Sequence, residues 1–593
     1  MKHPNKRKKP SEPRPSGSVR HSLCIAGALA GLIAVFWAYS PALHGPFLFD
    51  DNFLPFATSN LSTATLGSWL HGVRPMLMFT YWVNAALSQD DTFSYHVVNV
   101  IIHCITAGLV LLIVRRLLQT APFARGSDRS MNPHSEPRPE GAVSTQRSSG
   151  PLLSGFAAAL FLLHPVQTEA VAYLAGRSES LSVMLAFAAL AVFLYRRPGP
   201  ISWPAVAVIL VLFGAALLAK EHTIVLPALL LLTDYWWSPK SVRSNWRLYA
   251  AIAAAGVAGA VFLLPLLLHA TTAGFGLKDF TWYQYFFTEW RALFVYLREF
   301  ILPVNLTADW DFPLSRTILD HGAVIALIAL LAISAAAWHY RRRFALAAYG
   351  WFVFLLLMAP TSSILPIQDT VAERRLYFAI LGLLLILVDF VRRIPIRRQA
   401  LTIACAVLLL VSAAATHARA AIWSDPVTLW QDNVARSPNK RRDHVNLGFA
   451  YYAGGRYQDA IAEFQRTAEL GPPTLDLLVD WGLAYQKLGN LDLALAKFRE
   501  AAALQPPSAV AYVNIAQVYG TRRDLPDALD ALAVAEKLDP GLPDIYLNRG
   551  KVHLLSNEPA AAAQDFARVL SIDPSNSEAQ QLLVRARQSS PAK

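Results

Sequence analysis

The chain has 593 residues, of which 54% are hydrophobic and only 16% are charged. Soluble proteins carry about a quarter charged residues, so this composition excludes a soluble globular enzyme and a disordered chain and indicates a membrane protein. The three cysteines stand in apolar runs without CxxC spacing. That placement excludes a disulfide scaffold, a cysteine metal cluster and a redox motif.

The net charge of +12 is unevenly distributed along the chain. Residues 441–593 hold 16 Lys and Arg against 18 Asp and Glu, a balance of −2, so residues 1–440 carry +14. Basic clusters follow alternate apolar runs, as the positive-inside rule requires of a multispanning membrane protein. This distribution argues against a nucleic-acid-binding surface.

The predicted elements begin with a basic, Pro- and Ser-rich segment, residues 1–20, which we expect to be a disordered cytoplasmic tail. Residues 21–420 predict a bundle of about 11 membrane-spanning helices, interrupted at 119–150 by a cytoplasmic linker loop. The apolar segment 282–302 holds four charged side chains, which are unfavourable in lipid. We therefore predict an interfacial or re-entrant helix there, with the N-terminus of the chain inside and the C-terminus outside.

Residues 421–593 are less apolar and repeat with a period of 34 residues. The period is marked by Pro472, Pro506, Pro540 and Pro574, by small residues at 448, 482, 516 and 550, and by large residues at 464, 498, 532 and 566. This pattern is typical of tetratricopeptide repeats, predicted near 441–474, 475–508, 509–542 and 543–576, with a capping helix from Ser577. The predicted fold class is therefore all-α, a membrane bundle followed by an α-solenoid.

Ionisable residues gather in the segments that this topology places on the outer face. The candidate site residues are Asp50, Asp51, Arg74, His164, Glu169, Arg177, Glu179, Lys220, Glu221, Glu373, Arg374 and Arg375. Charges beside lipid tend to be functional, although a turn aspartate or a snorkelling arginine is the simpler explanation of any single one. Because Arg374 and Arg375 violate the positive-inside trend, they favour a phosphate ligand. No P-loop, GxGxxG, GxSxG or HExxH motif and no metal-ligand spacing occurs.

An ordered series of short motifs runs through the membrane part of the chain. It consists of FDD at 49–51, RP at 74–75, YHVVN at 95–99, HPVQTEAVA at 164–172, GRSE at 176–179, KE at 220–221 and AERRLY at 372–377. Together with the 34-residue repeats, this series resembles the transmembrane and tetratricopeptide-repeat-containing O-mannosyltransferases and their bacterial relatives. Such proteins belong to the GT-C class of glycosyltransferases. The resemblance covers the chain from about Phe47 to Pro574.

The resemblance implies a polyprenyl- or dolichyl-phosphate-linked sugar donor, usually mannose, an extracytoplasmic active site and inversion at the anomeric carbon. The acceptor it implies is a Ser or Thr hydroxyl on a protein. Asp50 or Asp51 would act as general base. The phosphate ligands would come from Arg74, Arg177, Lys220, Arg374 and Arg375, while His164 and Glu169 would orient the sugar or the base. No cofactor beyond this co-substrate is expected, and the implied location is a bacterial inner membrane with periplasmic repeats.

Other functions remain open from the residues alone. Repeat arrays usually bind a peptide or protein, so the repeats are expected to bind the acceptor protein. Alternatively, the enzyme acts on a lipid or envelope glycan and the repeats recruit other enzymes. A non-enzymatic, membrane-anchored repeat scaffold is a third possibility. A transporter is disfavoured because the ionisable residues cluster at the outer face rather than at mid-span.

Overall fold

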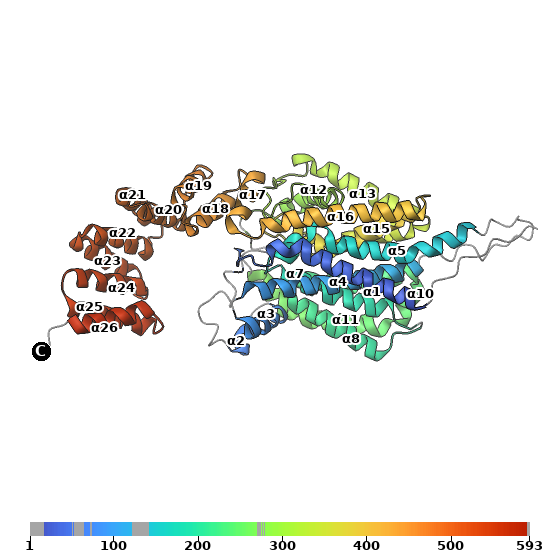
Figure 1. The fold of residues 1–593 in the computed structure, drawn as a ribbon, viewed down its shortest axis with the longest axis horizontal. Coiled ribbons are helices and arrows are strands. Elements are labelled where there is room, and N and C mark those ends of the chain that lie inside the picture. The colour runs from blue at the N-terminus through green and yellow to red at the C-terminus, as the bar shows by residue number, and fades with distance from the viewer. Residues whose placement is uncertain are drawn as a thin grey trace, which may run out of the picture. The chain divides into compact units, whose positions relative to one another are not determined.

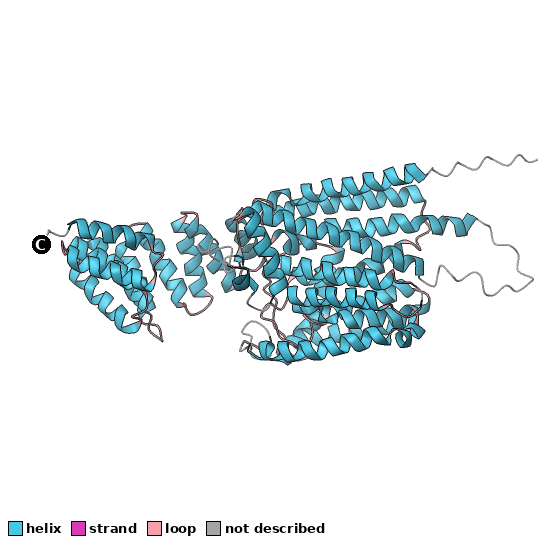
Figure 2. Cartoon of the chain, turned by 90° about the horizontal axis from the view of Figure 1, so that it is seen from below, coloured by secondary structure: helices cyan, strands magenta, loops and turns pink. Residues whose placement is uncertain are grey.

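The computed structural model describes residues 17–49, 51, 65–70, 74–89, 91–120, 141–197, 199–269, 274, 277 and 279–589. Every regular element among these residues is a helix, which confirms the predicted all-α class (Figure 2). The chain divides into two compact units, Met1–Leu429 and Trp430–Lys593. Most of the expected N-terminal tail and the centre of the expected 119–150 loop, residues 121–140, lie outside the described residues.

The first unit is a bundle of helices of different lengths (Figure 1). Its α-helices are α1 (Gly17–Tyr39), α2 (Leu66–Leu70), α3 (Pro75–Ser88), α4 (Thr92–Thr120), α5 (Gly141–Leu163), α6 (Thr168–Ala172), α7 (Arg177–Leu194), α8 (Trp203–Ala219), α9 (Leu226–Trp237), α10 (Pro239–Ser244), α11 (Trp246–His269), α12 (Trp282–Ile301), α13 (Ala323–His339), α14 (Ala345–Met358), α15 (Leu376–Val391) and α16 (Arg398–Ile422). Helix α17 (Pro426–Arg436) crosses the boundary between the units. Short 3₁₀ turns are η1 (Ser40–Ala42), η5 (Pro165–Gln167), η6 (Glu221–Val225), η7 (Asp320–Gly322), η8 (Tyr340–Arg342) and η9 (Glu373–Arg375).

Fewer helices are long and apolar enough to cross a membrane than the sequence predicted. Among the described residues, five helices are long and apolar enough to cross a membrane, or six if α5 and the segment 165–172, bent by 49°, form one span. The expected count of about 11 is therefore not confirmed. The difference arises because several apolar runs form short helices, such as α8 with 17 residues, α14 with 14 and α15 with 16. A straight span needs about 20 residues.

Helices α14 and α15 approach each other backbone to backbone. A Cβ added at Gly350 would lie 2.5 Å from the carbonyl oxygen of Gly382, and one added at Gly382 would lie 2.4 Å from that of Gly350. In an apolar bundle, such small residues permit the close van der Waals packing that replaces the hydrophobic driving force of water-soluble cores. This contact fixes α15 and thereby the turn η9 that precedes it.

The second unit is a series of antiparallel helix pairs, drawn in orange to red in Figure 1. Its helices are α18 (Arg441–Ala453), α19 (Tyr457–Glu469), α20 (Leu475–Lys487), α21 (Leu491–Ala502), α22 (Ala509–Arg522), α23 (Leu525–Leu538), α24 (Pro543–Leu555), α25 (Pro559–Ile572) and α26 (Ser577–Ser589). Each of the four predicted repeats contains one such pair, and α26 follows them at the position predicted for the capping helix.

Within three of the repeats, a glycine of the first helix faces a phenylalanine ring of the second. A Cβ added at Gly482 would lie 2.4 Å from the ring of Phe498, and glycines 448 and 550 have equivalent contacts of 2.5 and 2.6 Å. The remaining repeat carries Ala516 where the others have glycine and Leu532 where the others have phenylalanine. The extra methyl group of the alanine is thus accompanied by a smaller side chain on the second helix. The helix crossing therefore depends on the summed volume of the two side chains.

We expect Gly482→Ala to lower the free energy of unfolding of residues 430–593 by about 1–3 kcal/mol, because overpacking displaces Phe498. Adding Phe498→Leu should recover part of this loss, since it recreates the pairing of Ala516 with Leu532. Urea unfolding followed by circular dichroism measures both effects. Gly454→Ala, which has only ordinary contacts of 3.4 Å or more, serves as the control. An unchanged urea midpoint for Gly482→Ala would contradict this account of the crossing.

Candidate active site

The candidate site residues lie where apolar helices end and the chain turns. His164 closes α5, because its Nδ1 accepts a hydrogen bond from the Val166 amide (3.3 Å) and Pro165 starts the turn η5. Lys220 follows the last residue of α8, and Arg374 lies in η9 immediately before α15. The turns η5 and η9 pack against each other, and η9 also contacts α6. Segments far apart in the sequence thus meet at these helix ends.

Arg74 and Glu221 form a two-pronged ion pair between the start of α3 and the turn η6. Arg74 Nη2 donates to Glu221 Oε1 at 2.7 Å, and Nε donates to Oε2 at 3.1 Å. Burial raises the pKa of Glu221, but the Arg74 guanidinium outweighs this effect and lowers that pKa to about 2. The pair is therefore charged at neutral pH, and both side chains remain partly exposed, at 37% and 41%.

Lys220 forms a second ion pair with Glu179 of α7. Its Nζ lies 2.6 Å from Glu179 Oε2, and His222 Nε2 lies 3.0 Å from the other carboxylate oxygen. Burial lowers the pKa of Lys220; Glu179 opposes this effect, and the positive charges of Arg74 and Arg374 add to it. Lys220 is thus held by one carboxylate while two further cations act on it.

Arg374 forms a third ion pair, with Glu169 of α6. Its backbone amide donates to Glu169 Oε2 at 2.8 Å, its Nη1 donates to Oε1, and its Nη2 lies 3.3 Å from Asp369 Oδ2. We call Arg74, Lys220 and Arg374 the cation cluster. They come from three distant segments, and each retains some exposure, 37%, 15% and 29% of the side chain. An anion that reached these guanidinium and ammonium groups would meet three cations, each of which already pairs with a carboxylate.

Asp51 anchors the first predicted outer loop. Its Oδ2 accepts a hydrogen bond from the Leu48 amide at 3.0 Å, and its Oδ1 accepts one from the Ala175 amide at 2.8 Å. Asp50, the other candidate base, lies outside the described residues. Burial raises the pKa of the Tyr81 hydroxyl in α3, Arg177 lowers it, Asp51 raises it and Arg74 lowers it. The charges of Asp51 and Arg74 therefore act on the same residue of α3.

Two of the predicted ligands are engaged within the protein. Arg177 is fully buried, and its guanidinium donates to Asn99 Oδ1 (2.7 Å), Asn84 Oδ1 (3.0 Å) and the Tyr95 carbonyl (2.9 Å). It also stacks on the Tyr81 ring at 4.5 Å. Arg177 therefore ties α7 to α3 and α4.

His164 is likewise occupied. With Nδ1 accepting from the backbone, Nε2 is the protonated nitrogen and donates to the Phe300 carbonyl at 3.0 Å. The imidazole also stacks on the Phe300 ring, with centroids 5.5 Å apart. His164 thus holds the end of α12 against η5, and its role in the structure is to position these two elements.

Arg375 and Glu373 point toward the interior of the first unit. Arg375 Nη1 donates to Tyr285 Oη (3.2 Å) and the Thr370 carbonyl (2.9 Å) and lies 3.6 Å from Glu289 Oε1. Glu373 is fully buried, 3.9 Å from Arg419. Burial raises the pKa of Glu289 to about 7, although Arg375 opposes the shift. Of the adjacent arginines, only Arg374 belongs to the cation cluster.

Sequence reasoning did not select several charged residues of this region. Burial raises the pKa of Glu299 in α12 to about 8, and Arg419 is buried within the otherwise apolar α16. A charged residue inside an apolar run was the signal available for both. For Asp369, the sequence indicated only an acidic residue in a predicted outer loop, and its contact with Arg374 was not predicted. Within the described part of the chain, no group of three or more His, Cys, Asp or Glu side chains could hold a metal ion.

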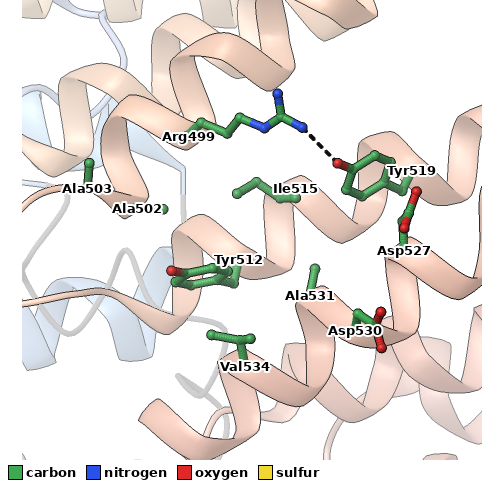
Figure 3. Close-up of a pocket in the computed structure, with 10 residues that line it drawn as sticks. All are labelled: Arg499, Ala502, Ala503, Tyr512, Ile515, Tyr519, Asp527, Asp530, Ala531 and Val534. Atoms are coloured by element: carbon green, nitrogen blue, oxygen red, sulfur yellow. Dashed lines mark hydrogen bonds between the residues drawn. The ribbon is translucent and has the colours of Figure 1, made fainter.

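The repeat unit has a groove between the second helices of two successive repeats. Figure 3 shows this groove, which has a volume of about 470 Å³. Its floor includes Ile515 and Ala531, while Asp527 and Asp530 of α23 lie on one side. On the opposite side Arg499 Nη2 donates to Tyr519 Oη at 2.9 Å. An apolar floor with acidic side chains beside it suits a peptide that carries both apolar and basic side chains.

Comparisons with known proteins agree with both units. A family model described as tetratricopeptide repeat matches residues 479–543 and 513–577. A protein O-mannosyl-transferase of Caenorhabditis elegans is 24% identical over 411 residues, which cover 67% of this chain and 54% of that protein. Protein O-mannosyl-transferase Tmtc3 of Drosophila melanogaster is 25% identical over 467 residues (67% and 48%), and TMTC1 of Homo sapiens is 24% identical over 524 residues (76% and 56%).

The chain spans about half the length of these curated relatives. The matched share of this chain exceeds the length of the repeats and therefore extends into the first unit. Apolar helices long enough to cross a membrane and C-terminal tetratricopeptide repeats occur in the same chain. By sequence the chain is thus a relative of the TMTC-type protein O-mannosyl-transferases and, like the family that its motif series resembles, combines membrane helices with tetratricopeptide repeats.

Proposed function

We propose that this chain is an inverting glycosyltransferase that moves a sugar, mannose being the first to test, from a polyprenyl phosphate to a protein hydroxyl. The observation that carries the proposal is the cation cluster, in which the charges of Arg74 and Arg374 act on Lys220. Asp51 belongs to the same region, because its charge and that of Arg74 both act on Tyr81. The names of the relatives support sugar transfer to proteins.

The proposed reaction is a single displacement. The acceptor hydroxyl attacks the anomeric carbon and its proton passes to a carboxylate, Asp50 or Asp51, while the bond from that carbon to the lipid phosphate oxygen breaks. A positioned carboxylate accelerates such a step by about 10²–10⁴-fold. Negative charge develops on the departing phosphate, and the cation cluster would stabilise it there more than in the ground state. The carboxylates that pair with the cluster keep its cations in place before the donor arrives.

The proposed orientation places the N-terminus in the cytoplasm and the repeats on the extracytoplasmic side, in a bacterial inner membrane. It follows the basic clusters at the ends of alternate apolar runs. The cation cluster and Asp51 would then lie at the extracytoplasmic ends of the helices. A lipid-borne donor and a secreted acceptor protein can both reach that position.

The repeats would bind the acceptor protein, as repeat arrays generally bind peptides or proteins. The groove of Figure 3 offers a surface with an apolar floor and two carboxylates, Asp527 and Asp530. An acceptor bound there would be held near the enzyme at a high effective concentration, because binding to the repeats makes the second encounter intramolecular.

Of the two variants Asp50→Asn and Asp51→Asn, we expect the one that removes the general base to lower kcat for sugar transfer by about 10²–10⁴-fold. Asp51→Asn also replaces a hydrogen-bond acceptor of the Leu48 or Ala175 amide by a donor, so its thermal stability should fall as well. Transfer from a radiolabelled polyprenyl-phosphate sugar measures the rate. Asp91→Asn, at an exposed position, is the control. Wild-type rates in both variants would refute the assignment of the base.

Lys220→Gln should lower kcat by about 10²–10³-fold, because a cation at the leaving phosphate is lost. The lowered pKa of Lys220 means that the wild-type rate falls on the alkaline side as the ammonium deprotonates. Lys220→Arg should move that fall to higher pH, since the guanidinium stays protonated. The pH dependence of kcat measures this shift, and an unchanged alkaline limb would contradict it. In contrast, Arg177→Gln should reduce the amount of folded protein.

Filling the repeat groove should weaken modification of a whole acceptor protein but spare transfer to a short acceptor peptide at saturating concentration. Ala503→Trp places an indole at the edge of the groove, whereas Ala533→Trp puts the same side chain on the exposed surface of α23 outside it. Mass spectrometry of envelope proteins from cells that carry each variant measures the outcome. Equal modification in both variants would show that this groove does not bind the acceptor.

A further inference from the structure

A second groove lies between α12 and α13 in the first unit. Its volume is about 560 Å³, within the range of small-molecule sites. The lining residues are Arg291, Phe294, Val295, Arg298, Phe312, His321, Gly322, Ile325, Ala326 and Ala329. Apart from Arg291, Arg298 and His321, this described lining is apolar. The lining of this groove includes no member of the cation cluster and none of the carboxylates that pair with it.

The groove opens beside a helix that faces lipid. Helix α13 lies within the candidate span Asp320–Arg342, of which only 11% is buried. Its side chains Ile325, Ile328 and Leu331 are 69%, 61% and 60% exposed. Large apolar side chains exposed to this extent on a span are covered by acyl chains in a membrane. The apolar wall of the groove is therefore continuous with a surface that contacts the bilayer.

Two arginines mark the α12 side of the groove. Arg291 and Arg298 are seven residues apart on α12, about two helical turns, and therefore share one face. Arg291 Nη1 donates to the Pro313 carbonyl (2.8 Å) and Ser315 Oγ (3.0 Å), and its guanidinium lies 4.6 Å from the centre of the Phe312 ring. Arg298 lies 5.4 Å from the centre of the Trp310 ring. None of the described lining residues is acidic, so the groove attracts an anion.

The neighbouring face of α12 contacts the candidate active site. The Tyr296 hydroxyl accepts a hydrogen bond from the Ala372 amide at 3.2 Å, one residue before η9. Glu289 lies 3.6 Å from Arg375, and the Phe300 carbonyl accepts from His164 at 3.0 Å. Helix α12 is thus the wall between the groove and the segment that carries Arg374. An occupant of the groove would help to hold this helix in place.

We propose that this groove binds one anionic phospholipid of the bilayer, with an acyl chain against Phe294, Val295 and Ala326 and the headgroup phosphate at Arg291 and Arg298. The charge of the lining favours an anionic headgroup over a zwitterionic one, and the apolar wall suits a single acyl chain. Because the two arginines approach a phosphate as charged donors, each contributes a charge-assisted hydrogen bond. This lipid site does not depend on the proposed sugar transfer.

The test uses the full chain purified in detergent and native mass spectrometry with added phosphatidylglycerol or phosphatidylcholine. We expect the wild type to retain one phosphatidylglycerol with at least about tenfold preference over phosphatidylcholine, because the choline ammonium offsets the phosphate charge beside the two arginines and leaves the charge-assisted contacts weaker. Ala326→Trp, which fills the groove, and Arg298→Gln should each weaken that retention about tenfold or more. Ala335→Trp on the exposed surface of α13 and Arg316→Gln at an exposed position outside the groove should retain it.

Equal retention of phosphatidylglycerol in Ala326→Trp and Ala335→Trp would overturn the proposal. So would equal retention of the two lipids by the wild type, or specific retention of a polyprenyl phosphate in place of phosphatidylglycerol. Arg291→Gln also breaks the bonds to residues 313 and 315 and could misfold, so the decisive variants are the two at Ala326 and Arg298. Loss of phosphatidylglycerol in both Ala326→Trp and Arg298→Gln would support the lipid site. This result would hold whether or not the proposed sugar transfer is correct.

Discussion

The ion pair of Arg374 with Glu169 joins residues 205 positions apart, and the rest of the candidate site depends on it. An unpaired charge this deep in an apolar helical unit would be unfavourable, so each cation must be matched by a carboxylate. The pairs of Arg74 with Glu221 and Lys220 with Glu179 follow the same constraint. As a result, the carboxylates determine where the cations lie, and the three cations meet because their partners sit at neighbouring helix ends.

The packing that makes these helix ends neighbours uses very small residues. Gly350 and Gly382 bring α14 and α15 into backbone contact, and α15 begins directly after the turn that carries Arg374. In the repeats, close helix packing has a different basis, because in three of them a glycine of one helix contacts a phenylalanine ring of the other. In both units a missing side chain sets the distance between two helices. The helices of the first unit position charges, whereas those of the second line a groove.

Helix α12 links the interior to the bilayer surface. One face holds Glu289, Tyr296 and Glu299 against the turns of the candidate site, and another lines an apolar groove with two arginines. Burial raises the pKa values of Glu289 and Glu299 on the inner face of α12, while its outer face carries Arg291 and Arg298. This asymmetry suits a helix at the boundary between protein and lipid and explains why four charges occur in an apolar segment.

The sequence by itself determined the helical class, the apolar first unit, the register of the repeats and most candidate residues. Each of these depends on local composition or on a period, such as the 34 residues between Pro472 and Pro506. Only the tertiary structure decided that Arg177 and His164 hold helices together while Arg374 belongs to the cation cluster. Only it showed that several apolar runs form helices too short to span a membrane unaided. The physical reason is that the role of a charge depends on its partner, and the glutamates that pair with the cation cluster lie from 41 to 205 residues away from their cations.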